Sequence, residues 1–177
     1  MKASHAVAIQ RYDLIRNDAR KIAKESLPPF LKRLVLSKID LRAINAFRTW
    51  QQMPGRKVDW DWMFAYRYCA RYPKAFDLSV WHGNTLLSLT LGRPTYKGTS
   101  MRMDFVERRP ENCLFAGDLF AVSLLAYETY GRLVGAEHIR LIEPMNQKLI
   151  AYYTSKDGGF RYVARKQGNP HYLEKKL

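Results

Sequence analysis

The side chains best suited to proton transfer lie near the ends of two expected strands. Glu107 closes the alternating run 100–108, and the pair Tyr152 and Tyr153 stands in an expected helix that follows the apolar run 138–143. A carboxylate can accept a proton and a phenol can donate one, so these residue types could supply both partners of an acid–base reaction. They form a site only if the surrounding elements bring them together.

The pattern over residues 74–177 predicts strands that alternate with helices. Two short apolar runs, 75–81 and 85–92, flank His82-Gly83-Asn84, which is typical of a β-hairpin. In the run 100–108, apolar Met101, Met103 and Phe105 alternate with their neighbours, which predicts a strand with one buried face.

Further along, residues 119–136 predict the strongest helix, with Gly135 at its C-terminal end. A strand over 138–143, a helix over 145–156 and final strands over 159–166 and 170–176 follow. The fold class is therefore α/β (α+β), with a mixed β-sheet in which residues 100–142 are a candidate right-handed strand–helix–strand unit.

The chain is expected to divide into a helical N-terminal region, residues 1–58, and a second domain, residues 59–177. Residues 5–26 have apolar residues at helical spacing and stop before Pro28-Pro29. Residues 29–54 predict one or two short helices. Residues 59–73 predict another helix, with Asp59 or Asp61 as a possible N-terminal cap.

The composition is that of a basic globular chain. Its 177 residues carry a formal net charge of +14, and residues 1–66 and 67–177 contribute +7 each, so no basic tail dominates. This positive charge could serve to bind nucleic acid, an anionic cofactor, an acidic protein or an anionic membrane surface. Two cysteines and four histidines lack metal-ligand spacing, so no metal is expected and a cytoplasmic location is the default. No apolar run is long enough for a membrane span, and no signal peptide is expected.

Three segments resemble the GCN5-related N-acetyltransferase (GNAT) family, over about residues 59–165. The first is MRMDFVERRP at 101–110, a strand that ends in an acidic residue. The second is the loop and long helix at 111–141, which contains YGRLVGAEHIRL. The third is EPMNQKLIAYYTSKDGGF at 143–160, where Asn146 and Tyr153 have the family's spacing of seven and the Gly-Phe ending comes later than usual.

The resemblance implies an acetyl-CoA-dependent transfer and a role for each matching residue. Glu107 would be the base, and Tyr153, with Tyr152 as the alternative, the acid. Phe105 and Val106 would offer backbone groups to the pantetheine and acetyl groups, and Asn146 would lie near the cofactor. The loop 113–118 would hold the pyrophosphate, with Arg108 and Arg109 adding positive charge; its candidate cofactor-binding residues are Leu114, Phe115, Ala116, Gly117 and Asp118.

Several interpretations stay open at this level. The first is an acyl-CoA-dependent N-acyltransferase that acts on an unknown amine. The second is an inactive GNAT-like protein whose basic surface docks nucleic acid or a protein partner, and the third is an acetyltransferase of aminoacyl-tRNA. In parallel, Glu107 could be a solvent-facing carboxylate paired with Arg108 or Arg109, the two tyrosines could be packing residues, and Asp118 could cap the helix.

Overall fold

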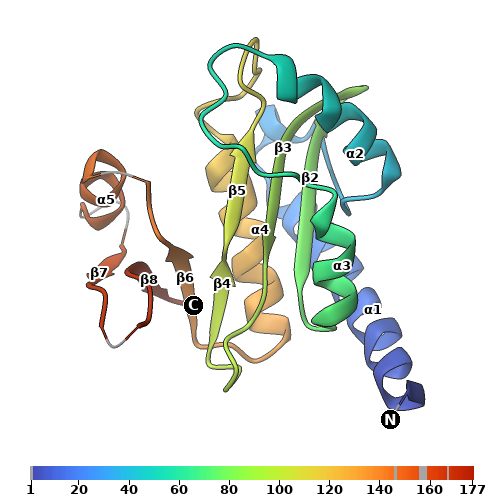
Figure 1. Cartoon of the computed structure of the whole chain (residues 1–177), viewed down its shortest axis with the longest axis vertical. Coiled ribbons are helices and arrows are strands. Elements are labelled where there is room, and N and C mark those ends of the chain that lie inside the picture. Colours follow the sequence, from blue (N-terminus) through green and yellow to red (C-terminus); the bar gives the residue numbers. More distant parts are fainter. Residues whose placement is uncertain (1, 146, 156–158, 167) are drawn as a thin grey trace.

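The structure, a computed structural model, describes residues 2–145, 147–155, 159–166 and 168–177 (Figure 1). The elements are, in chain order, α1 (Lys2–Ser26), the 3₁₀ helix η1 (Pro29–Leu31), β1 (Leu34–Ser37), α2 (Leu41–Arg48), the 3₁₀ helix η2 (Thr49–Gln52), α3 (Phe64–Arg71), β2 (Phe76–His82), β3 (Thr85–Gly92), β4 (Ser100–Met103), β5 (Phe105–Arg108), α4 (Leu119–Leu133), β6 (His138–Ile142), α5 (Gln147–Thr154), β7 (Arg161–Val163) and β8 (Tyr172–Lys176).

The strands form two four-stranded sheets that meet in the chain run 100–108. One sheet has the order β1-β2-β3-β5 and the other β4-β6-β8-β7. β4 and β5 are consecutive, so this run belongs to both sheets. β4 and β6 pair in parallel across α4, while the other strand pairs are antiparallel. The predicted mixed α/β fold is confirmed, with the strand–helix–strand unit at its centre.

Helices cover both faces of the strands and enclose two hydrophobic clusters. In Figure 1, α4 passes behind the strands, and α2 and α3 lie on the nearer side. We call the first cluster, which lies against α1 and α4, the α1/α4 cluster; it includes Ala19, Ala23, Leu78, Val80, Met101, Met103, Val122, Ala126, Ile139 and Leu141. The second, the α2/α3 cluster, includes Ala43, Phe47, Trp50, Trp62, Trp81, Leu86, Leu89 and Leu91.

Two buried arginines fasten α1 to the rest of the fold. Arg16 donates to the carbonyl oxygens of Pro73 and Ala75 at 2.9 and 3.1 Å. Arg20 donates to the carbonyl and the carboxylate of Asp77, both at 2.8 Å. Since hydrogen bonds that involve a charged group contribute more than neutral ones, α1 is held in place by more than its apolar face.

The sequence predictions are correct where a glycine marks the turn or the end of a helix. The hairpin turn at Gly83, the helix that ends before Gly135, and the helix and strand after it are all present, and both glycines have positive φ, 56° and 79°. Within the range 29–54, which was expected to be helical, residues 34–37 instead form β1, which pairs with β2. The domain boundary after residue 58 stays a prediction.

The alternation predicted for 100–108 is wrong at Phe105. Pro94 lies opposite Met101, and Leu91 lies opposite Phe105. Three residue steps, from 94 to 91, therefore face four steps, from 101 to 105. The extra residue makes a β-bulge near Asp104, whose N–H donates to the Leu91 carbonyl at 3.0 Å. Phe105 therefore packs in the α2/α3 cluster instead of sharing a face with Met101.

Candidate functional site

Before the bulge in chain order, the strand run is paired on both of its edges. After the bulge, it is paired on one edge. β4 pairs with β6 from Ser100 opposite His138 to Met103 opposite Leu141, and this pairing stops where β5 begins. β5 pairs only with β3 among the described residues. Figure 1 shows the chain after β6 turning away from β5 toward α5. A gap therefore opens beside one edge of β5.

The backbone groups that face this gap follow from the register. The N–H of Arg109 donates to the Leu87 carbonyl at 2.8 Å, and Glu107 pairs with Leu89. Because backbone groups of an antiparallel strand point alternately to either side, those of Val106 and Arg108 point away from β3. Of the residues expected to offer backbone groups here, Val106 is the one whose N–H and C=O face the gap.

Glu107 is buried at this gap, with three donors on its carboxylate. Its side chain is 4% exposed and pairs with Arg56 Nε at 2.7 Å. Trp62 Nε1 donates to its other oxygen at 2.6 Å, and Arg56 Nη2 reaches the same oxygen at 3.3 Å. The solvent-facing pairing with Arg108 or Arg109 is thus wrong. A carboxylate has about four acceptor positions, so one remains for water or substrate.

A small cavity of about 160 Å³ connects these groups. Its walls are the segment 55–58, the end of the strand run and a residue that follows β6, namely Gly55, Arg56, Lys57, Val58, Val106, Glu107, Arg108, Pro110 and Met145. Glu107 and Val106 thus line one space. Sequence reasoning missed Arg56, Trp62 and Met145, which have no spacing signal that connects them to Glu107.

The loop ahead of α4 is compact, and two of its non-glycine residues, Asn112 and Phe115, have positive φ. Phe115 has φ of 61°, a left-handed conformation that disfavours a large side chain, yet its ring packs on the α1/α4 cluster and lies 5.5 Å from the His82 ring. Its carbonyl accepts from the N–H groups of Asp118 and Leu119. Leu114 is exposed, and a Cβ on Gly117 would meet nothing within 4 Å.

The first turn of α4 contains backbone N–H groups that are available as hydrogen-bond donors. Asp118 occupies the N-cap position, as the capping alternative expected, but its side chain makes no capping hydrogen bond. Within the described part of the chain, the N–H groups of Phe120 and Ala121 make no hydrogen bond, whereas that of Val122 donates to the Asp118 carbonyl. Unpaired N–H groups at a helix start attract an anion. Ala116 precedes this turn within the loop.

Charge near this loop comes from two arginines at the end of the strand run. Arg108 is exposed and lines the cavity beside Glu107. Arg109 is partly buried, and its Nε donates to the Glu111 carbonyl at 3.0 Å. Burial raises the pKa of the nearby Cys113 thiol, and the Arg108 guanidinium opposes this rise.

Tyr153 lies beside the start of α4, on the opposite face from Glu107. Its ring is 4.6 Å from that of Phe120 and 5.8 Å from that of Phe160, and it packs against the α1/α4 cluster. Burial, with a smaller contribution from Tyr152, raises the pKa of Tyr153, so its hydroxyl keeps its proton. Tyr152 is 69% exposed. Asn146, the remaining expected cofactor residue, lies outside the described residues.

Metal-binding and membrane-spanning features are both absent from the part of the chain that the structure describes. Within residues 2–145, 147–155, 159–166 and 168–177, no three histidine, cysteine or acidic side chains come close enough to hold a metal ion. Over the same residues, no helix has the length and apolar character needed to cross a membrane.

Comparison with solved structures identifies the architecture. PaiA N-acetyltransferase from Thermoplasma acidophilum, solved with coenzyme A, matches with a TM-score of 0.55 and 14% identity, over 81% of this chain and 99% of its own. Ard1 from Thermoplasma volcanium matches with a TM-score of 0.60 and 12% identity, over 82% and 98%. This chain has the GNAT fold. The ribosomal-protein-S18-alanine N-acetyltransferase of Escherichia coli matches likewise, with a TM-score of 0.58 and 11% identity, over 81% and 94%.

These structures share the GNAT fold with the chain at low identity. No protein-family model matches the sequence, and no curated protein matches it. The matched structures are covered almost completely, while about a fifth of this chain has no counterpart in them.

Proposed function

We propose that the protein is an acyl-CoA-dependent N-acyltransferase that transfers an acetyl group from acetyl-CoA to an amine by direct attack. The observation that carries this proposal is the bulged strand run, paired on both edges over β4 and on one over β5. It leaves the outward backbone groups of Val106 without a strand partner among the described residues, beside a cavity that Glu107 also lines.

The residues around this gap fit the cofactor. Gly117 leaves open space at the loop, and the unpaired N–H groups of Phe120 and Ala121 suit a pyrophosphate. Arg108 and Arg109 add positive charge nearby. When bound, acetyl-CoA supplies an activated acetyl group and a thiolate leaving group.

The proposed division of roles follows the two faces of the strands. A free amine of the lysine type has a pKa of about 10.4, so it must lose a proton before it attacks. Glu107, on the α2/α3 side, would take that proton through a water at its remaining acceptor position. The N–H of Val106 would stabilise the developing oxyanion. Tyr153, on the α1/α4 side, keeps its proton and would donate it to the leaving group.

Titration calorimetry with acetyl-CoA tests the proposal directly. We expect saturable binding with one site per chain in the wild type. Gly117→Leu should fold normally, because a Cβ at this position meets nothing within 4 Å, yet its side chain should weaken acetyl-CoA binding by obstructing the loop. Lys97→Gln, an exposed residue on the β3–β4 turn, is the charge control. Absence of binding at millimolar acetyl-CoA would refute the proposal.

A catalytically inactive binding protein is the second candidate, and two observations favour it. The carboxylate of Glu107 is already held by Arg56 and Trp62, and the loop carries Phe115 where small residues would let phosphate approach. This candidate predicts that neither acetyl-CoA binding nor turnover occurs, while an anionic partner binds with strong salt dependence.

A further inference from the structure

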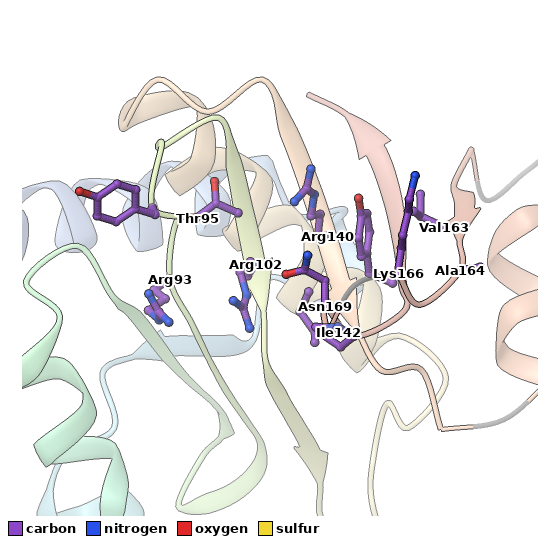
Figure 2. Close-up of a pocket in the computed structure, with 12 residues that line it drawn as sticks. Arg93, Thr95, Arg102, Arg140, Ile142, Val163, Ala164, Lys166 and Asn169 are labelled. Atoms are coloured by element: carbon purple, nitrogen blue, oxygen red, sulfur yellow. The ribbon is translucent and has the colours of Figure 1, made fainter.

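A cavity of about 520 Å³ opens on the face of the strands that carries α2 and α3. Figure 2 shows Arg102 and Arg140 on the neighbouring strands β4 and β6, Arg93 just after β3, and Lys166 and Asn169 from the β7–β8 connection. The residues that line the cavity include four cations and no acidic side chain. A volume in this range suits a small molecule.

Carboxylates or an aromatic ring hold the arginines in place, and the arginines retain unused N–H donors for a ligand. Arg102 and Arg140 are register partners on β4 and β6. Asp104 accepts from Arg102 at 2.6 Å, and Glu174 accepts from Arg140 Nε at 2.8 Å. Each guanidinium has five N–H groups, so these pairs leave most of its donors unused. Arg93 lies over the Tyr72 ring, with its guanidinium carbon 4.1 Å from the ring centre.

The positive charge of the cavity exceeds the negative charge of the carboxylates that pair with its arginines. Asp104 and Glu174 offset two of the four lining cations, and Arg161, which shares Glu174 with Arg140, adds another positive charge. The cluster as a whole keeps a net charge of +3. A single carboxylate ligand would neutralise one of these charges, whereas a phosphate monoester carries about −2. Phosphate also matches the planar fork of donors that arginine offers.

This cavity is distinct from the proposed cofactor loop and lies close to the gap. Arg102 points to the face opposite Met101 and Met103, which pack toward α4. The start of α4 therefore lies on the other side of the sheet. Along the strand run, Arg102 and Val106 are four residues apart. Because the bulge lies between them, this separation corresponds to three ordinary strand steps, or about 10 Å.

We infer that this basic cavity binds a phosphate group of the acceptor, and that the acceptor is a small phosphorylated amine. The assignment to an acceptor rests on the proposed acyl transfer, but binding of phosphate by the cavity does not. A nucleic-acid surface would spread its cations along the molecule, whereas these four line one cavity.

Calorimetry with inorganic pyrophosphate, in the absence of acetyl-CoA, tests the inference. We expect saturable binding to the wild type that weakens as salt is added. Lys166→Gln removes an exposed side chain and should weaken binding by about tenfold, and Arg93→Gln/Lys166→Gln by about a hundredfold. Lys97→Gln, which removes one charge from the turn outside the cavity, should change affinity by less than about twofold. Thermal unfolding of each variant confirms that it is folded.

Three outcomes would overturn the inference. Pyrophosphate could fail to bind the wild type at millimolar concentration. It could bind the wild type and both cavity variants equally, which would place it elsewhere, for example at the start of α4. Lys97→Gln could weaken binding of pyrophosphate or of a single-stranded oligonucleotide as much as Lys166→Gln does, which would indicate a diffuse nucleic-acid surface. Acetyl-CoA binding without pyrophosphate binding would leave the proposed function intact, and the reverse result would leave the cavity intact.

Discussion

The pair Arg56 and Glu107 allows the structural and catalytic roles of the carboxylate to be separated. Their side chains are 13% and 4% exposed and their closest atoms are 2.7 Å apart. Removing one partner of a buried pair leaves the other charge without compensation, which costs about 3–5 kcal/mol. We therefore expect Arg56→Met and Glu107→Gln each to lower the free energy of unfolding by at least about 3 kcal/mol. In a chain of this length that is a fall in Tm of roughly 6–12 °C.

The double variant Arg56→Met/Glu107→Gln should be more stable than the two single effects predict. It removes both charges, and the side-chain amide oxygen of the introduced glutamine can still accept from Trp62 Nε1. A coupling energy of about 2–3 kcal/mol is expected from urea unfolding followed by circular dichroism. Arg48→Met, at an exposed position, is the control and should change stability by less than about 0.5 kcal/mol.

Turnover by the same variants, measured on the folded fraction, decides the role of Glu107. Arg56→Met frees the carboxylate from its guanidinium and makes it a better proton acceptor, so its turnover should be retained or raised. Glu107→Gln removes the proton acceptor and should lower turnover by about 10²–10⁴-fold. Equal losses in Arg56→Met and Glu107→Gln would refute a role as base and leave Glu107 as a packing residue with a buried ion pair.

Three other substitutions probe the gap and its supports. Tyr153→Phe should lower turnover with little effect on acetyl-CoA affinity by calorimetry. Because burial raises the pKa of its hydroxyl, wild-type activity should show no loss from Tyr153 ionisation as pH rises to about 10, its ordinary value, in a pH–rate profile. Asp118→Asn should strengthen acetyl-CoA binding by removing a negative charge near the helix start, at a stability cost of under about 1 kcal/mol. Gly92→Ala should destabilise by roughly 3 kcal/mol or more in urea unfolding, because its Cβ would lie 2.0 Å from the Arg102 carbonyl oxygen.

The elements could be predicted where a local signal sets them. The hairpin at Gly83 and the end of α4 at Gly135 need positive φ, and glycine marks both in the sequence. β1 was missed because LVLS at 34–37 is too short for its periodicity to separate helix from strand. Its state is decided by pairing with β2, which lies about forty residues further along.

The partners of Glu107 could not be predicted for a similar reason. Arg56 is 51 residues away and Trp62 is 45 residues away, so no spacing rule connects them to the carboxylate. Arg108 and Arg109 follow Glu107 directly in the sequence, which made them the expected partners. In a strand, however, successive side chains point to opposite faces, which removes the immediate neighbour from reach. The choice of partner is therefore set by tertiary packing of the 55–62 segment.

The failure of the pattern at Phe105 is connected to the proposed function. A regular strand from Met101 to Arg108 would keep Phe105 on the face of Met101 and would put Glu107 there as well, against the α1/α4 cluster. The extra residue at the bulge reverses the alternation, so Glu107 turns toward Arg56 and Trp62 on the other face. Bulges also bend a strand and end its pairing, and β5 indeed has no partner on its second edge among the described residues. The residue that breaks the sequence pattern thus both orients the candidate base and opens the gap beside Val106.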